Sequence, residues 1–184
     1  MKILILSPLF PPDTAPSAIY VKELATRLSS HEVSILLYGH LPEKIPGVRL
    51  FCIDKRKSIL GRAVSFIKKL NGSVRENEIV IIQNGPSVEF PSLFSLWFTK
   101  TPVILMESDI SALERTNSQW LQKTIYSMLK KRANLVLSKE NINIPPPKPL
   151  IHSLKENSDS EINSYERIWT EHLKKVEEIL KEHV

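Results

Sequence analysis

The chain has 184 residues, 42% of them hydrophobic, so it can bury one sizeable core but not two ordinary α/β domains. The single Cys52 excludes an internal disulfide framework, and a net charge of +5 does not by itself predict a nucleic-acid or membrane partner. No apolar stretch reaches membrane-spanning length, and the run after Met1 is too short for a signal-peptide core. We therefore predict a cytoplasmic protein, soluble or peripheral to a membrane.

The first 28 residues predict a strand, a loop and a helix. The unbroken apolar run Ile3–Leu6 is typical of a strand buried on both faces of a parallel sheet, so we expect it to be central. Prolines then end the strand, and apolar residues recur at helical spacing from Ala18 to Leu28. Ligands of such sheets bind beyond the carboxyl ends of the strands, so the loop from Ser7 to Ser17 is the first candidate site.

Strands and helices alternate along the rest of the chain up to residue 140. We predict further strands at 32–38, 48–53, 78–83, 103–106 and 135–138. Helices are predicted from Ile59 to a stop at Asn71-Gly72, from Pro91 onward, and over 120–132. This alternation predicts an α/β fold: a single Rossmann-like domain of about six mostly parallel strands with helices on both faces. Cys52, inside an apolar run, is expected to be buried.

Two predicted helices carry apolar side chains that another element must cover. The predicted helix that contains Leu93 to Phe98 is apolar around most of its circumference, so we expect it to be deeply buried or partly covered by another element, of which the tail is one candidate. A long carboxyl-terminal helix over 158–184 has an apolar seam that includes Trp169 and predicts packing along one side. It folds back on its own domain or pairs with a second copy. The predicted division is 1–140 as domain, 141–157 as proline-rich linker, and 158–184 as helix.

Three segments resemble family 4 glycosyltransferases, which have the two-domain GT-B fold. They are SPLFPPDTAPSAIYVKELATRLSSHEVSILLYG, EIVIIQNGPS and TPVILMESD, and the resemblance covers residues 1–140. It implies the amino-terminal, acceptor-side domain, and it implies that Trp169 belongs to the helix that crosses back from the donor domain. The donor domain itself is expected on a separate polypeptide.

The resemblance also implies a site. Carboxylates after the strand 103–106 can accept a proton from a hydroxyl nucleophile, so Asp109 is the first catalytic candidate and Glu107 the second. Strand alternation lets the two side chains point the same way. Asp109 as a helix cap is the alternative interpretation. The predicted substrate-binding residues come from the loops after the first and fourth strands: Pro12, Asp13, Thr14, Ser17, Asn84, Gly85 and Ser87.

Two departures from the family separate the functional hypotheses. The loop from Ser7 to Ser17 has no glycine to let backbone amides approach a diphosphate, and Ser108 stands where the family usually has arginine. The first hypothesis is the acceptor half of a transferase, which moves a sugar from a nucleotide sugar to a glycan or lipid-linked acceptor. The second is a non-catalytic descendant that binds a ligand or partner. A flavodoxin-like binding domain is the third.

Other partners follow from charge and motif content. The segment 55–69 is amphipathic with a basic fringe, which is typical of a solvated surface face or of a helix that rests on anionic lipid at the inner membrane face. No dinucleotide or phosphate-loop motif occurs, and the histidines lack metal-ligand spacing. We therefore predict no metal, no cofactor other than a nucleotide sugar as co-substrate, and no nucleic-acid partner.

Overall fold

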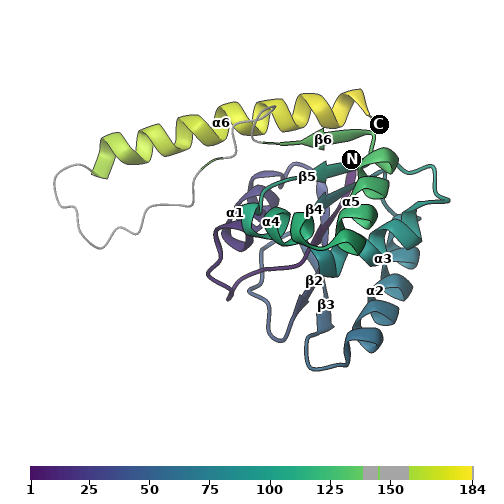
Figure 1. The fold of residues 1–184 in the computed structure, drawn as a ribbon. Helices are drawn as coiled ribbons and strands as arrows, with labels where there is room; N and C mark the ends of the chain where they lie inside the picture. The colour runs from purple at the N-terminus through teal and green to yellow at the C-terminus, as the bar shows by residue number, and fades with distance from the viewer. Residues whose placement is uncertain (139–144, 146–157, 184) are drawn as a thin grey trace.

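The computed structural model describes residues 1–138, Pro145 and 158–183, with the backbone alone at 158–161. Six strands form one sheet in the order β3-β2-β1-β4-β5-β6, and every pair of neighbours is parallel (Figure 1). The strands are β1 (Lys2–Ser7), β2 (Glu32–Gly39), β3 (Arg49–Asp54), β4 (Ile79–Gln83), β5 (Val103–Met106) and β6 (Leu135–Leu137). The helices are α1 (Pro16–Arg27), α2 (Ile59–Val74), α3 (Pro86–Leu96), α4 (Ile110–Ser118), α5 (Trp120–Arg132) and α6 (Ser158–Glu182). The predicted Rossmann-like α/β fold is confirmed.

The first strand occupies the centre of the sheet, as predicted. In the register, Ile5 lies opposite Ile35 of β2 on one side and Ile81 of β4 on the other. The side chains from Ile3 to Leu6 are buried because both faces of the sheet carry helices. Strand order reverses between β1 and β4, which places a ligand-binding crevice at their carboxyl ends.

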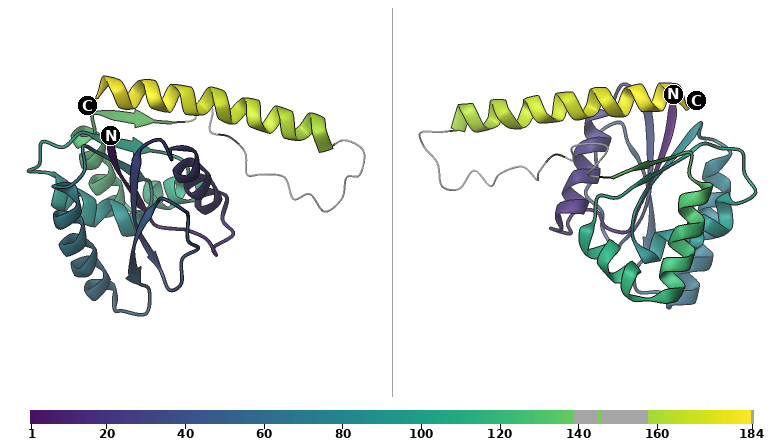
Figure 2. Two further views of the ribbon diagram at one scale, coloured as in Figure 1. Left: turned by 180° about the vertical axis from the view of Figure 1, so that it is seen from behind. Right: turned by 45° about the horizontal axis from the view of Figure 1, so that its top comes forward.

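Two helical layers cover the sheet. On one face the core side chains of α1 and α6 pack together, and we call this the α1–α6 layer. On the other face lie α2, α3 and α5, the α2–α3–α5 layer. In the first layer, Trp169 of α6 stacks on Tyr20 of α1 with ring centroids 5.5 Å apart. The predicted folding back of the tail is therefore confirmed, and the amino terminus lies beside the end of α6 in both views of Figure 2. The predicted linker 141–157 lies outside the described residues apart from Pro145.

Several predictions about helices are wrong. The predicted stop at Asn71-Gly72 does not end α2, which continues to Val74 because Leu70 and Val74, one helical turn apart, are both buried. Pro91 does not begin a helix but lies inside α3. A proline there cannot donate to the Ser87 carbonyl one turn back, and the Tyr38 hydroxyl donates to that carbonyl instead, at 3.0 Å. The helix α4 was not predicted as an element in its own right, although the capping interpretation of Asp109 implies a helix at this place.

Two burial predictions need correction. The apolar helix α3 is partly covered by other elements, as predicted, but these are α2 and α5 and not the tail: α6 packs on the opposite layer, and Phe94 and Phe98 of the α3 region are 67% and 91% exposed. Cys52 is exposed because β3 is an edge strand that is only partly covered. Both errors have the same cause: an apolar pattern shows that a segment can be buried, not that a covering element exists.

Candidate functional site

Three loops meet at the carboxyl edge of the sheet, and one buried glutamine joins them. The Ser7 hydroxyl donates to Oε1 of Gln83 at 2.5 Å. The Gln83 amide nitrogen donates to the Ser17 carbonyl at 2.8 Å and to the Ser108 hydroxyl at 3.0 Å. The ends of β1, β4 and β5 are thus tied to the start of α1. Sequence reasoning missed Gln83, although a polar residue that ends an apolar strand is a usable signal.

Asp109 follows β5 at this edge and is hydrogen-bonded to Asn84, Ala112 and Ser17. The Asn84 amide clamps its backbone: Oδ1 accepts from the Asp109 N–H at 2.9 Å, and Nδ2 donates to the Asp109 carbonyl at 2.6 Å. The Asp109 carboxylate accepts from the Ala112 amide at 2.9 Å, which makes it the N-cap of α4, and from the Ser17 hydroxyl at 3.4 Å. The capping interpretation is confirmed, and the same side chain lines the pocket described below.

Glu107 has different partners. Its carboxylate accepts from the Tyr126 hydroxyl, and Lys130 Nζ lies 2.7 Å from it. Burial and this neighbouring carboxylate raise the pKa of Tyr126, so the phenol stays protonated. Glu107 does not line the pocket that Asp109 lines. The two predicted catalytic carboxylates therefore share no partner.

A pocket of about 650 Å³ opens beside Asp109. Its apolar lining includes Leu9, Phe90, Leu121 and Ile125. Besides Asp109, its basic and polar lining side chains are Lys55, Arg62, Arg115, Tyr38, Ser87 and Gln122. Burial raises the pKa of Tyr38 to about 12, so this phenol remains a neutral hydrogen-bond donor. The pocket can accept an anionic group that also carries an apolar part.

The predicted substrate-binding residues are divided between several places. Gly85 and Ser87 line the pocket with Asp109, whereas Asn84 is buried beneath it. Pro12 and Asp13 line a separate pocket of about 410 Å³, and Lys55 belongs to both. Ser17 is buried and bonded to Asp109, and Thr14 lines neither pocket.

Gly85 fixes the approach of the first two loops. Its φ of +156° is rarely adopted by other residues, and a Cβ there would lie 2.8 Å from Pro8 Cγ. The buried Glu89 carboxylate accepts from the Gly85 amide at 2.8 Å and so holds this turn against the start of α3. Burial raises the pKa of Glu89 to about 7. Sequence reasoning missed Glu89, because nothing in an apolar helix indicates which face its single acid takes.

The loop after β1 has few backbone donors left for a ligand. The Asp13 amide donates to the Phe10 carbonyl at 3.1 Å, and the Ala15 amide donates to the Asp13 side chain at 3.1 Å. Pro11, Pro12 and Pro16 have no N–H. Across the described residues, no group of three His, Cys, Asp or Glu side chains could hold a metal ion. None of the described helices combines the length and apolarity that crossing a membrane requires.

Comparison with known proteins supports the fold. The sequence matches no protein-family model and no curated protein. A solved structure assigned as a UDP-N-acetylglucosamine 2-epimerase from Listeria monocytogenes aligns with a TM-score of 0.55 at 14% identity over 76% of this chain. HepE from Anabaena, solved with UDP and glucose, aligns with a TM-score of 0.52 at 16% identity over 74%. The chain spans 41% and 37% of those two chains. These likenesses support a GT-B-like fold and do not single out family 4.

Proposed function

We propose that this chain is the acceptor-binding half of a GT-B-type glycosyltransferase, which acts with a donor-binding half on a separate polypeptide. The observation that carries the proposal is the 650 Å³ pocket beside Asp109, at the carboxyl edge where strand order reverses. Two solved structures of similar fold support it, since one is assigned to a UDP-sugar enzyme and the other holds UDP and glucose.

In this proposal Asp109 takes the proton of the acceptor. The acceptor hydroxyl oxygen bonds to the anomeric carbon of the sugar, and the bond from that carbon to the diphosphate breaks. The electron pair leaves with the nucleoside diphosphate, and the hydroxyl proton passes to the Asp109 carboxylate. Asp109 is suited to this because Asn84 clamps its backbone and its carboxylate lines the pocket.

The lining of the pocket favours a lipid-linked acceptor over a plain glycan. Arg62 and Arg115 can pair with a phosphate, and Arg115 supplies a charge that Ser108 does not. Leu121 and Ile125 offer an apolar surface to a lipid chain. The separate donor-binding polypeptide binds the donor diphosphate in this proposal, because the loop from Ser7 to Ser17 has few free backbone amides to donate to phosphate oxygens.

The alternative function is a non-catalytic, glycosyltransferase-derived binding domain. The favouring observation is that the Asp109 carboxylate already caps α4 and accepts from Ser17, which is a complete structural role. Under this alternative the pocket binds the same class of anionic amphiphile, but Asp109 transfers no proton. Assays with a donor-binding polypeptide separate the two: the catalytic case gives sugar transfer that D109N abolishes, whereas the non-catalytic case gives no transfer with either chain.

Calorimetric titration of the full chain tests the half-site proposal. We expect farnesyl diphosphate, a soluble analogue of a lipid-linked acceptor, to bind, and UDP or UDP-glucose alone not to bind. Removal of both guanidinium groups in R62A/R115A should weaken farnesyl diphosphate binding roughly tenfold or more. R49A is the matched control, since Arg49 is an exposed cation on β3 outside the pocket. Tight binding of UDP by the chain alone, or no binding of farnesyl diphosphate, would overturn the proposal.

A further inference from the structure

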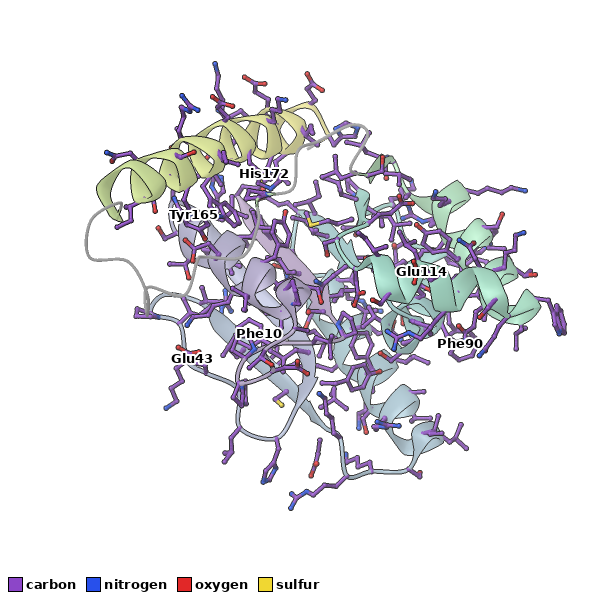
Figure 3. The ribbon with its side chains drawn as sticks, turned by 60° about the vertical axis from the view of Figure 1, so that its left-hand side comes forward. Phe10, Glu43, Phe90, Glu114, Tyr165 and His172 are labelled. Carbon is purple, nitrogen blue, oxygen red and sulfur yellow. The ribbon has the colours of Figure 1, made fainter. Side chains whose placement is uncertain are left out.

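The outer surface of α3, the turn after it, and α5 exposes large apolar side chains that no described element covers. We call it the α3–α5 face, and its exposed members are Phe90, Phe94, Trp97, Phe98, Trp120, Leu121 and Met128. A groove of about 250 Å³ runs between the two helices, and Phe94, Trp97 and Met128 line it. In Figure 3, Phe90 lies on the far side of the domain from α6, whose Tyr165 and His172 point into the core. The chain therefore buries the aromatic residues of its tail and leaves these in solvent.

The charged residues in the segments that form the α3–α5 face are mostly basic. Over α2, α5 and the segment 86–102 the sequence has eight Lys or Arg residues and one acid, Glu89, which is buried. Lys100, Lys123 and Lys131 are exposed at the face itself. None of these three lysines has an ion-pair partner among the described residues. Within these segments the face is thus apolar at its centre, basic at its rim and free of exposed acids, and the neighbouring α4 carries the exposed Glu114.

We propose that the α3–α5 face docks on the surface of an anionic lipid bilayer. Phe94, Trp97 and Phe98 enter the boundary between headgroups and acyl chains, where aromatic side chains are favoured, and the lysines pair with lipid phosphates. A second copy fits this face poorly, because a symmetric contact would bring its lysines together without an acid to pair them. The chain's own tail is already packed on the opposite layer.

Bilayer docking would place the candidate pocket at the lipid surface. Phe90 and Ile125 line both the groove and the 650 Å³ pocket, so the two are adjacent. Ile59 of α2 also lines the pocket, and it is an exposed apolar residue like its neighbours Leu60 and Val64. The inference goes beyond the proposed function and does not depend on it, because lipid binding requires no sugar transfer.

Co-sedimentation of the full chain with vesicles tests the docking proposal. We expect binding to vesicles of phosphatidylglycerol and phosphatidylcholine in equal parts, and little binding to phosphatidylcholine alone. F94S/F98S should reduce the partition at least about tenfold, because both side chains supply apolar area to the interface. L41S/I162S is the matched control and should bind like the natural chain, since Leu41 and Ile162 are exposed apolar residues outside the face. Circular dichroism checks that every variant is folded.

Charge reversal provides the second arm. K123E/K131E should weaken binding to anionic vesicles by far more than tenfold and remove its salt sensitivity, whereas K174E/K175E on α6 changes the net charge equally and should have a much smaller effect. The tryptophan emission should shift to the blue on binding, because Trp97 and Trp120 both lie on the face. Absence of binding to anionic vesicles, or binding that F94S/F98S leaves unchanged, overturns the proposal. Sedimentation equilibrium that shows a dimer lost in F94S/F98S, without vesicle binding, assigns the face to a second copy and also overturns it.

Discussion

The α1–α6 layer and the α2–α3–α5 layer both carry a tryptophan among aromatic neighbours at helical spacing. In the first, Trp169 is 1% exposed, lies between Tyr20 and Tyr165, and has the Arg27 guanidinium 5.1 Å from its ring centroid. In the second, Trp97 and its neighbour Phe98 are exposed. The same sequence pattern therefore gives a buried helix–helix contact in one layer and a solvent-exposed surface in the other. The two layers differ in whether a second element of the chain covers these aromatic side chains.

The largest expected effect on stability comes from disrupting the packing of Trp169 against α1. W169A should lower the free energy of unfolding by about 3–5 kcal/mol, because it removes a fully buried ring and leaves a cavity between α1 and α6. Urea unfolding followed by circular dichroism measures the change. F98A is the matched control on the α2–α3–α5 layer and should shift stability by no more than about 0.5 kcal/mol. Equal effects of the two substitutions would show that α6 is not packed on α1 in solution.

The second prediction concerns Glu89, the one acidic residue in the helices of the α2–α3–α5 layer. The pKa of Glu89 is about 7 in the folded protein, above its ordinary value of 4.5. The folded state therefore favours the protonated form, and the stability of the natural chain should fall as pH rises from 4.5 to 7. At about 1.4 kcal/mol per pKa unit, the fall attributable to Glu89 is roughly 3 kcal/mol.

E89Q isolates this contribution, because glutamine keeps an oxygen to accept from the Gly85 amide but does not ionise. The difference in unfolding free energy between E89Q and the natural chain should grow between pH 4.5 and 7 and then stay constant. Urea titrations at a series of pH values measure it. A difference that does not depend on pH would mean that Glu89 ionises in the fold as easily as in the unfolded chain.

Much of the fold could be predicted from local pattern alone. The apolar run Ile3–Leu6 placed β1 at the centre, and the carboxyl ends of β4 and β5 placed Asn84 and Asp109 at the site edge. Sequence pattern could not show which layer the tail would cover, because Trp169 and Trp97 both lie among aromatic neighbours, yet only Trp169 is covered by another element. It also could not show that Gln83 ties three loops together, since its partners Ser7 and Ser108 are distant in sequence. Those facts depend on long-range packing.

The third prediction uses two glycines that differ in surroundings. G85A should cost about 1–3 kcal/mol, because the new Cβ would meet Pro8 at 2.8 Å in a conformation that favours glycine. Gly72 lies inside α2, and a Cβ added there would have no atom within 4 Å, so G72A should instead stabilise by about 0.5–1 kcal/mol. Thermal unfolding of both variants provides the comparison. Stabilisation by G85A would show that the first two loops are not held together at the pocket.

The smallest expected effect on stability is at Asp109, at the carboxyl edge of the sheet. It is also the most informative for function. Asp109 joins α1 through Ser17 to the first turn of α4. D109A should cost about 1 kcal/mol because it removes the cap, whereas D109N should change stability by less than about 0.5 kcal/mol, because asparagine caps helices equally well. Urea unfolding of both variants measures this. If D109N destabilises as much as D109A, the carboxylate is needed for the fold, and a loss of transfer in D109N could no longer be assigned to proton transfer. If D109N is as stable as expected, it keeps the helix cap and removes only the proton acceptor, so a loss of transfer can be assigned to proton transfer.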